Sequence, residues 1–369
     1  MRFLIIDTYY NVFLERFYAE NPNWGQQAYE AKWRYLMDQY FGTADFYSTN
    51  LQRLGHEATE IVANCRPLQL QWAAERGLVL RHKIQTGYYP RLRSSLPRLG
   101  KDWFYPVLLA QIKWHRPDVI HFQDPANTDP NFVREIRPYV RAISAQIASP
   151  IPAKADLSPY DLMLSSLPNF VDSFRQQGMR SAQLNAGFEP RVLDCLKQVS
   201  AFDVVFVGGL SSSHRSRIQF LENVAAKTRM DWWGYGLENL NADSPLRKAF
   251  RGPAWALAMY EKLLSARITL NHHIDVAEEY ANNMRLYEAT GVGSLLVTDA
   301  KRNLPALFEL GKEAAAYGDS AECVELIEYY LSHEEQRAST AYSGQQGTLR
   351  QHSYLTRMKE FLELIKPLL

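Results

Sequence analysis

The stretch Asp203-Val204-Val205-Phe206-Val207-Gly208-Gly209 carries the strongest signal for the fold. A continuous apolar run of this length predicts a strand that is buried on both faces, as in a parallel sheet. Two glycines follow it, and the spacing of apolar residues from about His214 to Lys227 predicts a helix. A buried strand, a tight turn and a helix form the repeating unit of an open α/β domain.

The same alternation of short apolar runs and helical stretches continues on both sides of this unit. Downstream and upstream, the pattern predicts strands at 3–6, 118–122, 162–165, 230–233, 267–270 and 294–298. We therefore predict an α/β protein with two Rossmann-like, parallel-sheet domains that face a central cleft. Turn residues near 185–190 mark the junction, which divides the chain into an N-terminal Rossmann-like domain (1–188), a C-terminal Rossmann-like domain (189–350) and a C-terminal helix (351–369). Packing of that helix against the N-terminal domain is one arrangement that the sequence leaves open.

Composition excludes several classes of protein. The chain of 369 residues has 41 Lys and Arg against 40 Asp and Glu, a net charge of +1, which argues against a nucleic-acid partner. Three cysteines, Cys65, Cys195 and Cys323, lie far apart, which argues against a zinc site or a disulfide framework and favours the cytoplasm. No apolar stretch approaches the roughly 18 residues of a membrane span. Peripheral contact with the inner face of a membrane stays open.

The turn after the strand at 203–207 is the first candidate site. Gly208 and Gly209 let the backbone approach a ligand closely, and the helix that follows presents free N–H groups to an anion. Ser211, His214 and Arg217 add hydrogen-bond donors and positive charge. We predict a phosphate cradle here, and a Ser-capped helix with solvated arginines is the alternative.

Two further candidates follow at later strand ends. The strand at 267–270 leads into Asn271-His272-His273, and neighbouring strand residues point to opposite faces. One histidine is therefore expected to face the cleft, which disfavours a metal-binding pair. In the third candidate, Asn283 is expected to cap a helix that carries Arg285 and Glu288, three residues apart and hence on one face. A helical salt bridge is the alternative to a role for Arg285 on a diphosphate and for Glu288 on ribose hydroxyls.

Taken in order and with their spacing, these motifs resemble the donor-binding half of GT-B glycosyltransferases of the "group 1" superfamily. More narrowly, they are similar to its bacterial spore-maturation-protein-B-like group, in which Ser-x-x-His-x-x-Arg and Asn-x-Arg-x-x-Glu-x-x-Gly patterns occur. Here these patterns are Ser211, His214 and Arg217, and Asn283, Arg285, Glu288 and Gly291. The resemblance covers about residues 203–360 and extends weakly into the first half. It implies a GT-B fold and no cofactor or metal, with a nucleotide-diphosphate sugar as co-substrate.

The resemblance assigns donor-binding roles to Gly208, Gly209, Ser211, His214, Arg217, Asn271, His273, Asn283, Arg285 and Glu288. It departs from retaining GT-B enzymes at one position, because Tyr280 stands where many of them carry a second glutamate, eight residues before Glu288. The sequence therefore leaves the stereochemistry open. An inverting enzyme needs a base from the N-terminal domain. The candidates at strand ends are Asp7, His121 and Asp124, each of which has a capping role as its alternative.

The acceptor is less constrained. It is expected to be a hydroxyl of a polysaccharide, a glycolipid or a small glycoside. Aromatic residues at Tyr9, Tyr10 and Phe13, together with Trp24, could stack on an acceptor sugar, although core packing is the commoner role of such residues. Two other functions share the donor motifs: a sugar-nucleotide epimerase of the GT-B type and a non-catalytic nucleotide-sugar binding protein.

Overall fold

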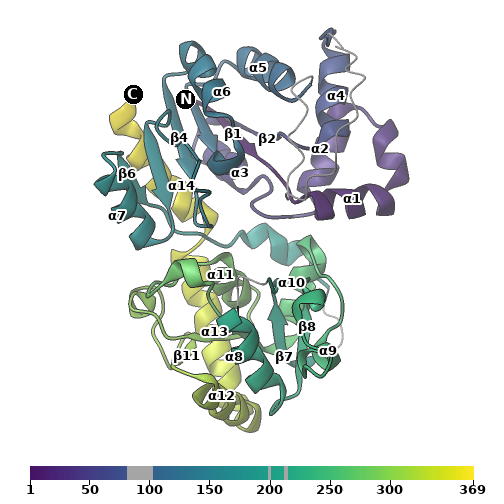
Figure 1. The fold of residues 1–369 in the computed structure, drawn as a ribbon, viewed down its shortest axis with the longest axis vertical. Helices are drawn as coiled ribbons and strands as arrows, with labels where there is room; N and C mark the ends of the chain where they lie inside the picture. Colours follow the sequence, from purple (N-terminus) through teal and green to yellow (C-terminus); the bar gives the residue numbers. More distant parts are fainter. Residues whose placement is uncertain (81–102, 198–200, 212–214) are drawn as a thin grey trace.

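The chain folds into two lobes that lie one above the other in the computed structural model (Figure 1). The structure describes residues 1–80, 103–197, 201–211 and 215–369. In this described part, each lobe contains one parallel sheet, with six strands in the first lobe and five in the second. The alternation of strands and helices in the sequence thus gives the predicted α/β architecture.

The N-terminal sheet has the strand order β2-β1-β3-β4-β5-β6. Its strands are β1 (Arg2–Asp7), β2 (Glu57–Val62), β3 (Val119–Phe122), β4 (Ala142–Gln146), β5 (Leu162–Ser165) and β6 (Ser181–Gln183). The residues of β1 show that both faces of this sheet are apolar. Phe3 and Ile5 join one hydrophobic cluster, while Leu4 and Ile6 join another on the opposite face. The period-2 alternation of a strand therefore places helices on both sides of the sheet.

The helices of the N-terminal lobe are α1 (Asn11–Glu20), α2 (Tyr29–Met37), α3 (Phe46–Arg53), α4 (Arg66–Glu75), α5 (Phe104–His115), α6 (Pro130–Ile136) and α7 (Pro168–Gln176). Tyr9, Phe13 and Trp24 are buried in a separate aromatic cluster formed by α1, α2 and α4. Tyr10 is the exception, because 61% of its surface is exposed. Of the aromatic residues considered for an acceptor sugar, Tyr10 alone keeps an accessible ring.

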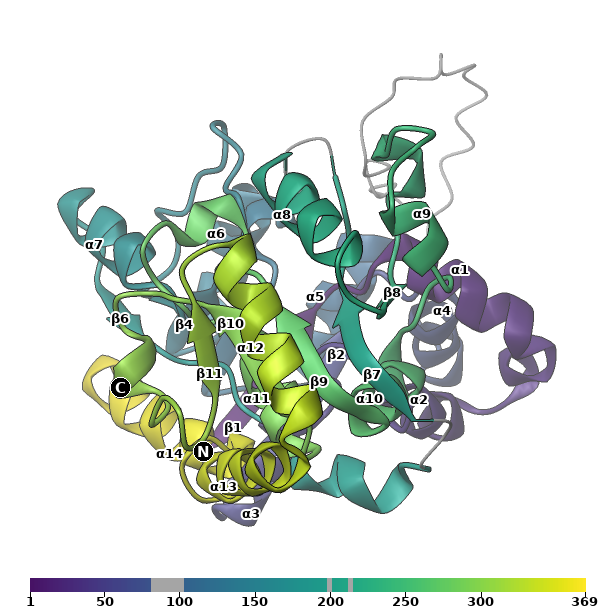
Figure 2. The same ribbon diagram turned by 90° about the horizontal axis from the view of Figure 1, so that it is seen from below.

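The C-terminal sheet has the order β11-β10-β9-β7-β8. Its strands are β7 (Phe202–Val207), β8 (Met230–Trp233), β9 (Ala266–Asn271), β10 (Leu295–Asp299) and β11 (Ala315–Tyr317). Its helices are α8 (Arg215–Ala225), α9 (Leu246–Ala249), α10 (Ala256–Leu264), α11 (Met284–Gly291), α12 (Ser320–Ser332) and α13 (Glu334–Gln351). In the view from below, α13 lies on the side of the lobe opposite α8 and α9 (Figure 2).

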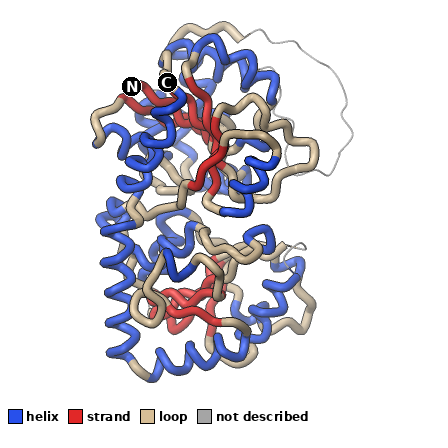
Figure 3. Tube along the Cα trace, turned by 90° about the vertical axis from the view of Figure 1, so that its left-hand side faces the viewer, coloured by secondary structure: helices blue, strands red, loops and turns tan. Residues whose placement is uncertain are grey.

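The chain crosses between the lobes twice, and the two crossings are hydrogen-bonded to each other. The Phe188 N–H donates to the His352 carbonyl at 2.8 Å, and the Tyr354 N–H donates to the Phe188 carbonyl at 3.0 Å. After the second crossing, α14 (Tyr354–Ile365) packs against the N-terminal lobe, where Phe361 contacts Phe3. The C-terminal helices therefore run along one side of both lobes (Figure 3).

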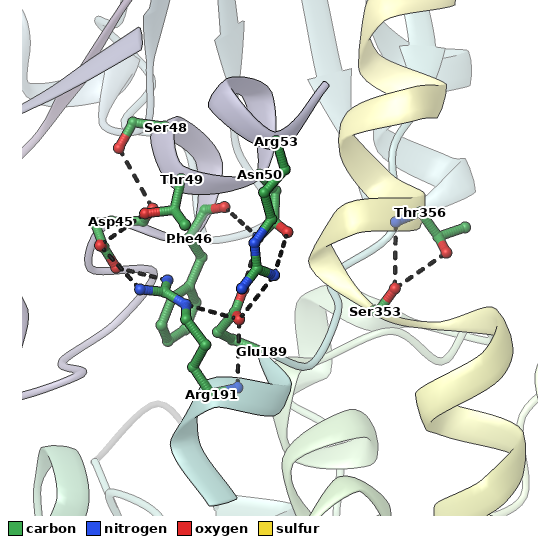
Figure 4. Close-up of polar contacts among 10 residues, drawn as sticks. All are labelled: Asp45, Phe46, Ser48, Thr49, Asn50, Arg53, Glu189, Arg191, Ser353 and Thr356. Carbon is green, nitrogen blue, oxygen red and sulfur yellow. Dashed lines mark hydrogen bonds and ion pairs between the residues drawn. The ribbon is translucent and has the colours of Figure 1, made fainter. Parts of the chain in front are cut away.

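A buried ionic network holds the first crossing to α3 (Figure 4). Glu189 is fully buried and accepts hydrogen bonds from Asn50 Nδ2 at 2.6 Å and from Arg191 Nε at 2.9 Å. Arg191 in turn donates to both carboxylate oxygens of Asp45, at 2.9 and 3.1 Å. Because every charge in this set has an opposite partner, the network joins the short helix Pro190–Cys195 to the N-terminal lobe without an unpaired buried ion.

Candidate functional site

The carboxyl ends of the two sheets face each other across the space between the lobes. At one side, Tyr10 of the N-terminal lobe contacts the Trp255 ring at a centroid distance of 5.9 Å. At the other, Ser166 Oγ donates to the Asn282 carbonyl at 3.1 Å. Desolvation of the hydroxyl group raises the pKa of Tyr10, although 61% of the residue's surface is exposed, and the nearby Tyr235, Asp7 and Asp124 raise it further. Groups from the strand ends of both lobes thus surround one region, as expected for ligand binding in open α/β sheets.

The predicted glycine turn lies at the end of β7. The Gly208 N–H donates to the Trp233 carbonyl at 3.0 Å, so the turn stays in register with the end of β8. A Cβ atom at Gly209 would lie 2.3 Å from the Tyr235 ring, so any other residue there would have to displace this ring. Ser211 follows at the edge of the turn and is half-buried. His214 lies outside the described residues.

Arg217, on the first turns of α8, joins the glycine turn to β9. Its Nη2 donates to the His272 carbonyl at 2.7 Å, and its Nη1 donates to the Gly209 carbonyl at 3.3 Å. Arg217 is 7% exposed, and its buried Nε has no partner. Burial lowers the pKa of this guanidinium, although Asp299 and Asp275 nearby oppose the shift. The Arg217 side chain therefore places a positive charge at the strand ends, and its Nε–H group has no hydrogen-bond acceptor among the described residues.

The two adjacent histidines have different surroundings, as expected from strand geometry. His272 stacks on Phe220 at 4.5 Å, and burial lowers its pKa to about 4. The His273 Nδ1 lies 2.7 Å from Asp299 Oδ1, while its buried Nε2 has no partner. Burial by itself would raise the pKa of Asp299, but its hydrogen bond with His273, together with the neighbouring histidines and Lys301, holds that pKa well below its usual range. Asp299 thus orients His273 and leaves Nε2 for a ligand.

Asn283 occupies the N-cap position of α11, but the predicted cap is wrong because its side chain makes no capping hydrogen bond. Its Nδ2 instead donates to Asn271 Oδ1 at 2.9 Å, and Asn271 Nδ2 donates to Thr298 Oγ1 at 2.9 Å. The buried Asn283 Oδ1 has no partner. This chain of amides places the start of α11 beside the ends of β9 and β10.

Arg285 and Glu288 form the helical ion pair that the sequence offered as the simpler interpretation, with Arg285 Nη1 at 2.7 Å from Glu288 Oε2. The pair faces α10, where the Tyr260 hydroxyl donates to Glu288 Oε1 at 3.5 Å. Arg285 Nη2 lies 3.1 Å from Met259 Sδ, and its buried Nε has no partner. Burial raises the pKa of Glu288, and Arg285 opposes this shift. Because Arg285 and Glu288 make few other contacts, each of them can exchange its present partner for a polar group of a ligand.

Two of the three candidate bases lie together in the N-terminal lobe. Asp7 ends β1 and accepts a hydrogen bond from the Thr8 N–H at 2.7 Å. Thr8 Oγ1 donates to Asp124 at 2.5 Å, which joins the ends of β1 and β3. Burial is the largest influence on Asp7 and raises its pKa to about 7, with Asp124 adding to the increase. A carboxyl group with such a pKa can accept a proton near neutral pH.

His121 does not fit the role of a base. It is fully buried within β3, where its ring stacks on Tyr47 at 5.5 Å and contacts Phe361 at 5.0 Å. Burial lowers its pKa to about 3. Because Tyr47 of α3 and Phe361 of α14 cover His121, an acceptor hydroxyl cannot reach it, and the predicted role of base is wrong for this residue.

Four of the unsatisfied buried side-chain atoms of the C-terminal lobe belong to residues that follow β9 or lie at the start of α8 or α11. Arg217 Nε, His273 Nε2, Asn283 Oδ1 and Arg285 Nε are all buried without a partner in the part of the chain that the structure describes. Contacts with Gly209, His272 and Asn271 connect Arg217, His273 and Asn283, and Arg285 lies two positions after Asn283 on α11. Because buried polar groups are normally hydrogen-bonded, a cluster of exceptions at the strand ends indicates a site for a polar ligand. Its two guanidinium groups favour an anion.

Some members of this site were not among the residues that the sequence pointed to. Asp299, which lies 26 positions after His273 in the sequence, orients the His273 ring. Thr8 links the carboxyl groups of Asp7 and Asp124. Tyr235 covers Gly209 from the end of β8. Asp299 directly follows a predicted strand and Tyr235 lies two residues after another, and these positions are a signal that could have identified them. Within the described ranges, no group of three or more His, Cys, Asp or Glu side chains is placed to hold a metal ion, and no helix is both long and apolar enough to cross a membrane.

Residues 215–363 match the model of a family described as glycosyl transferase-like. No curated protein matches the chain. Similar solved structures include AviGT4, a glycosyltransferase involved in avilamycin A biosynthesis, at 12% identity and a TM-score of 0.58, with 100% of this chain and 98% of that chain covered. Anabaena HepE in complex with UDP has 12% identity and a TM-score of 0.56, with both chains fully covered.

An α-glucosyltransferase in complex with UDP-glucose and DNA is also similar, at 11% identity and a TM-score of 0.60, with 99% of each chain covered. At these low identities the likeness concerns the fold. The two facing parallel-sheet lobes have the GT-B fold, which confirms the predicted fold class.

Proposed function

We propose that this chain is a glycosyltransferase, which moves a sugar from a nucleoside-diphosphate donor to a hydroxyl group of a carbohydrate acceptor. The observation that carries the proposal is the set of unsatisfied buried atoms from Arg217, His273, Asn283 and Arg285 in the C-terminal lobe. The oxygen atoms of a diphosphate would satisfy the donors in this cluster. The match of residues 215–363 to a glycosyl transferase-like model supports the same function.

The C-terminal lobe would bind the donor and stabilise the leaving group. Arg217, Arg285 and the N–H groups at the start of α11 supply positive charge where negative charge develops on the departing diphosphate. His273 Nε2 lies in the same region and is held by Asp299. Because these groups can carry out the electrostatic work of a metal ion, we propose that transfer is metal-independent.

The N-terminal lobe would bind the acceptor, and we assign the role of base to Asp7. Asp7 takes the proton of the acceptor hydroxyl while that oxygen forms a bond to the anomeric carbon. The bond between this carbon and the phosphate oxygen breaks, and its electron pair leaves with the diphosphate. Such a single displacement inverts the anomeric configuration. Asp124, linked to β1 by Thr8, is placed to hold the hydroxyl rather than to accept its proton.

Glu288 is proposed to bind the ribose hydroxyls after Arg285 turns to the diphosphate. Wild-type protein should then bind UDP about 10- to 150-fold more tightly than 2′,3′-dideoxy-UDP, since hydrogen bonds to a charged group contribute about 1.5–3 kcal/mol. In Glu288→Gln the two ligands should bind almost equally, as measured by isothermal titration calorimetry. Glu325→Gln, at an exposed position on α12, is the matched control. An unchanged preference in Glu288→Gln would remove the ribose role.

Uridine nucleotides are the first donors to test, because two of the similar structures contain UDP or UDP-glucose. We would titrate the protein with UDP, GDP, dTDP, ADP and CDP in EDTA and again in Mg²⁺. The nucleotide that binds is then supplied as its sugar conjugates, with and without candidate glycan acceptors. Transfer that needs an acceptor and proceeds in EDTA is the expected result. Turnover of the donor alone would favour an epimerase, and absence of nucleotide binding would refute the proposal.

A further inference from the structure

A pair of stacked aromatic rings lies beside the proposed diphosphate site. Tyr235, two residues beyond β8, stacks on Trp255 with the ring centroids 5.6 Å apart and the planes within 14° of parallel. The Tyr235 carbonyl accepts a hydrogen bond from the Leu210 N–H at 2.8 Å, so its backbone runs alongside the glycine turn. Its ring covers Gly209, yet 51% of the Tyr235 surface is exposed. A large aromatic surface is therefore presented to solvent next to an anion site.

Contacts from both lobes hold the second ring of the pair in place. Trp255 meets Tyr10 edge-to-face at 5.9 Å and Phe41 at 5.8 Å, and both of these come from the N-terminal lobe. Nearby, the Leu257 N–H donates to the Gln39 carbonyl at 3.1 Å. The buried Trp255 Nε1 has no partner. Trp255 is thus a fixed support, and the exposed Tyr10 approaches it from the opposite lobe.

Helix α10 connects these rings to the proposed ribose carboxylate. The helix begins at Ala256, directly after Trp255. Its residues Met259 and Tyr260 contact Arg285 and Glu288, respectively. A donor whose diphosphate lies at Gly209 and whose ribose lies at Glu288 would therefore place its remaining part near the start of α10. That remaining part is a planar heterocycle.

We propose that Tyr235, supported by Trp255, is the stacking surface for the nucleobase of the donor, and that Tyr10 closes over it from the N-terminal lobe. The inference rests on the proposed glycosyltransferase function and adds the residues that would recognise the base. Stacking on an aromatic face tolerates different bases, so these rings would strengthen the binding of any nucleotide, with smaller differences among bases. Because the closing ring belongs to the other lobe, binding of the base would favour approach of the two lobes.

The test is calorimetric titration of wild type, Tyr235→Ala and Tyr235→Phe with UDP and with inorganic pyrophosphate, which lacks the base. Tyr235→Ala should weaken UDP binding about 5- to 150-fold, the range seen when a stacked aromatic is removed, and should leave pyrophosphate binding unchanged. Tyr235→Phe should bind UDP like wild type. Tyr329→Ala, at a position on α12 that is 46% exposed, is the control for loss of a surface tyrosine.

The outcomes separate this inference from the function on which it rests. If wild type binds UDP and Tyr235→Ala binds it equally well, the base does not stack there and the inference is wrong while the transferase proposal survives. If Tyr235→Ala raises the KM for the acceptor and leaves UDP affinity intact, the rings bind the acceptor instead, which also overturns the inference. If wild type binds no nucleotide, both the inference and the proposed function are wrong. A parallel loss of pyrophosphate binding in Tyr235→Ala would show a disturbed glycine turn and would likewise count against base stacking.

Discussion

Replacement of Asp7 by asparagine is expected to lower kcat about 10²- to 10⁴-fold, the usual contribution of a positioned general base. Asparagine keeps the size of the side chain and can still accept a hydrogen bond from the Thr8 N–H, but it cannot take a proton. The affinity for the donor, which binds to the other lobe, should be unchanged. Steady-state kinetics with a saturating donor would measure the loss, and Asp172→Asn on the exposed face of α7 is the matched control.

The pH dependence of the wild type provides a second readout. A base acts in its ionised form, so the rate should rise with pH and level off above about 7, where Asp7 is deprotonated. Asp7→Asn should lose this rise. Product of inverted anomeric configuration, identified by proton NMR, is expected from the same reaction. If Asp7→Asn retains near-normal activity and the product keeps the donor configuration, Asp7 merely holds the acceptor and the transfer needs no base from the protein.

The same substitution should stabilise the fold at neutral and alkaline pH. The pKa of Asp7 is raised in the folded protein, so its protonated form favours folding, and this contribution is lost as the pH rises from about 4 to about 7. Asparagine is neutral throughout. The melting temperature of Asp7→Asn should therefore match that of wild type near pH 4 and exceed it at pH 8. Gain of stability together with loss of activity would distinguish a functional carboxyl group from a structural one.

Replacement of Arg285 by methionine is expected to weaken UDP binding by about 10- to 150-fold, because a charge-assisted hydrogen bond to the diphosphate contributes about 1.5–3 kcal/mol. Methionine preserves much of the apolar stem of Arg285 and removes the guanidinium group, whose Nη2 lies 3.1 Å from Met259 Sδ. Isothermal titration calorimetry with UDP and with pyrophosphate should show similar losses, since the interaction is with phosphate oxygens. Arg251→Met, in an ion pair with Asp231 and 47% exposed, is the control of the same chemistry.

Loss of Arg285 also leaves Glu288 without its ion-pair partner in a buried position. Unpaired buried charges destabilise proteins, so part of the effect could arise from the fold. The double variant Arg285→Met with Glu288→Gln removes both charges and should recover the melting temperature without recovering UDP affinity. Normal UDP binding by a folded Arg285→Met protein would refute the assignment of Arg285 to the diphosphate.

Local sequence patterns were sufficient for those parts of the site that lie at strand and helix ends. The apolar run before Gly208 and Gly209 predicted a strand followed by a turn. The strand is β7, and the turn after it is hydrogen-bonded to the end of β8. Asn271 and Asn283 were identified from their positions at the end of a strand and the start of a helix. Such positions can be inferred because periodicity and turn chemistry depend on neighbouring residues.

Predictions that required knowledge of contacts across the chain were less successful. Asn283 occupies the expected cap position, but Asn271 draws its side chain away from the helix. His121 lies in a predicted strand, yet α14, more than 200 positions further along the chain, covers it through Phe361. Nothing near His121 in the sequence indicates which face of the sheet that helix will occupy.

The sequence by itself determined the two parallel sheets and the placement of polar residues at their carboxyl ends, because hydrophobic periodicity and glycine turns act over a few residues. The tertiary structure alone decided which of these residues meet. It paired His273 with Asp299, placed Tyr235 over Gly209 and brought Tyr10 of the N-terminal lobe into contact with Trp255 of the C-terminal lobe. These contacts depend on how strands are ordered and how two lobes pack, since burial and charge act through space between residues that are distant in the chain.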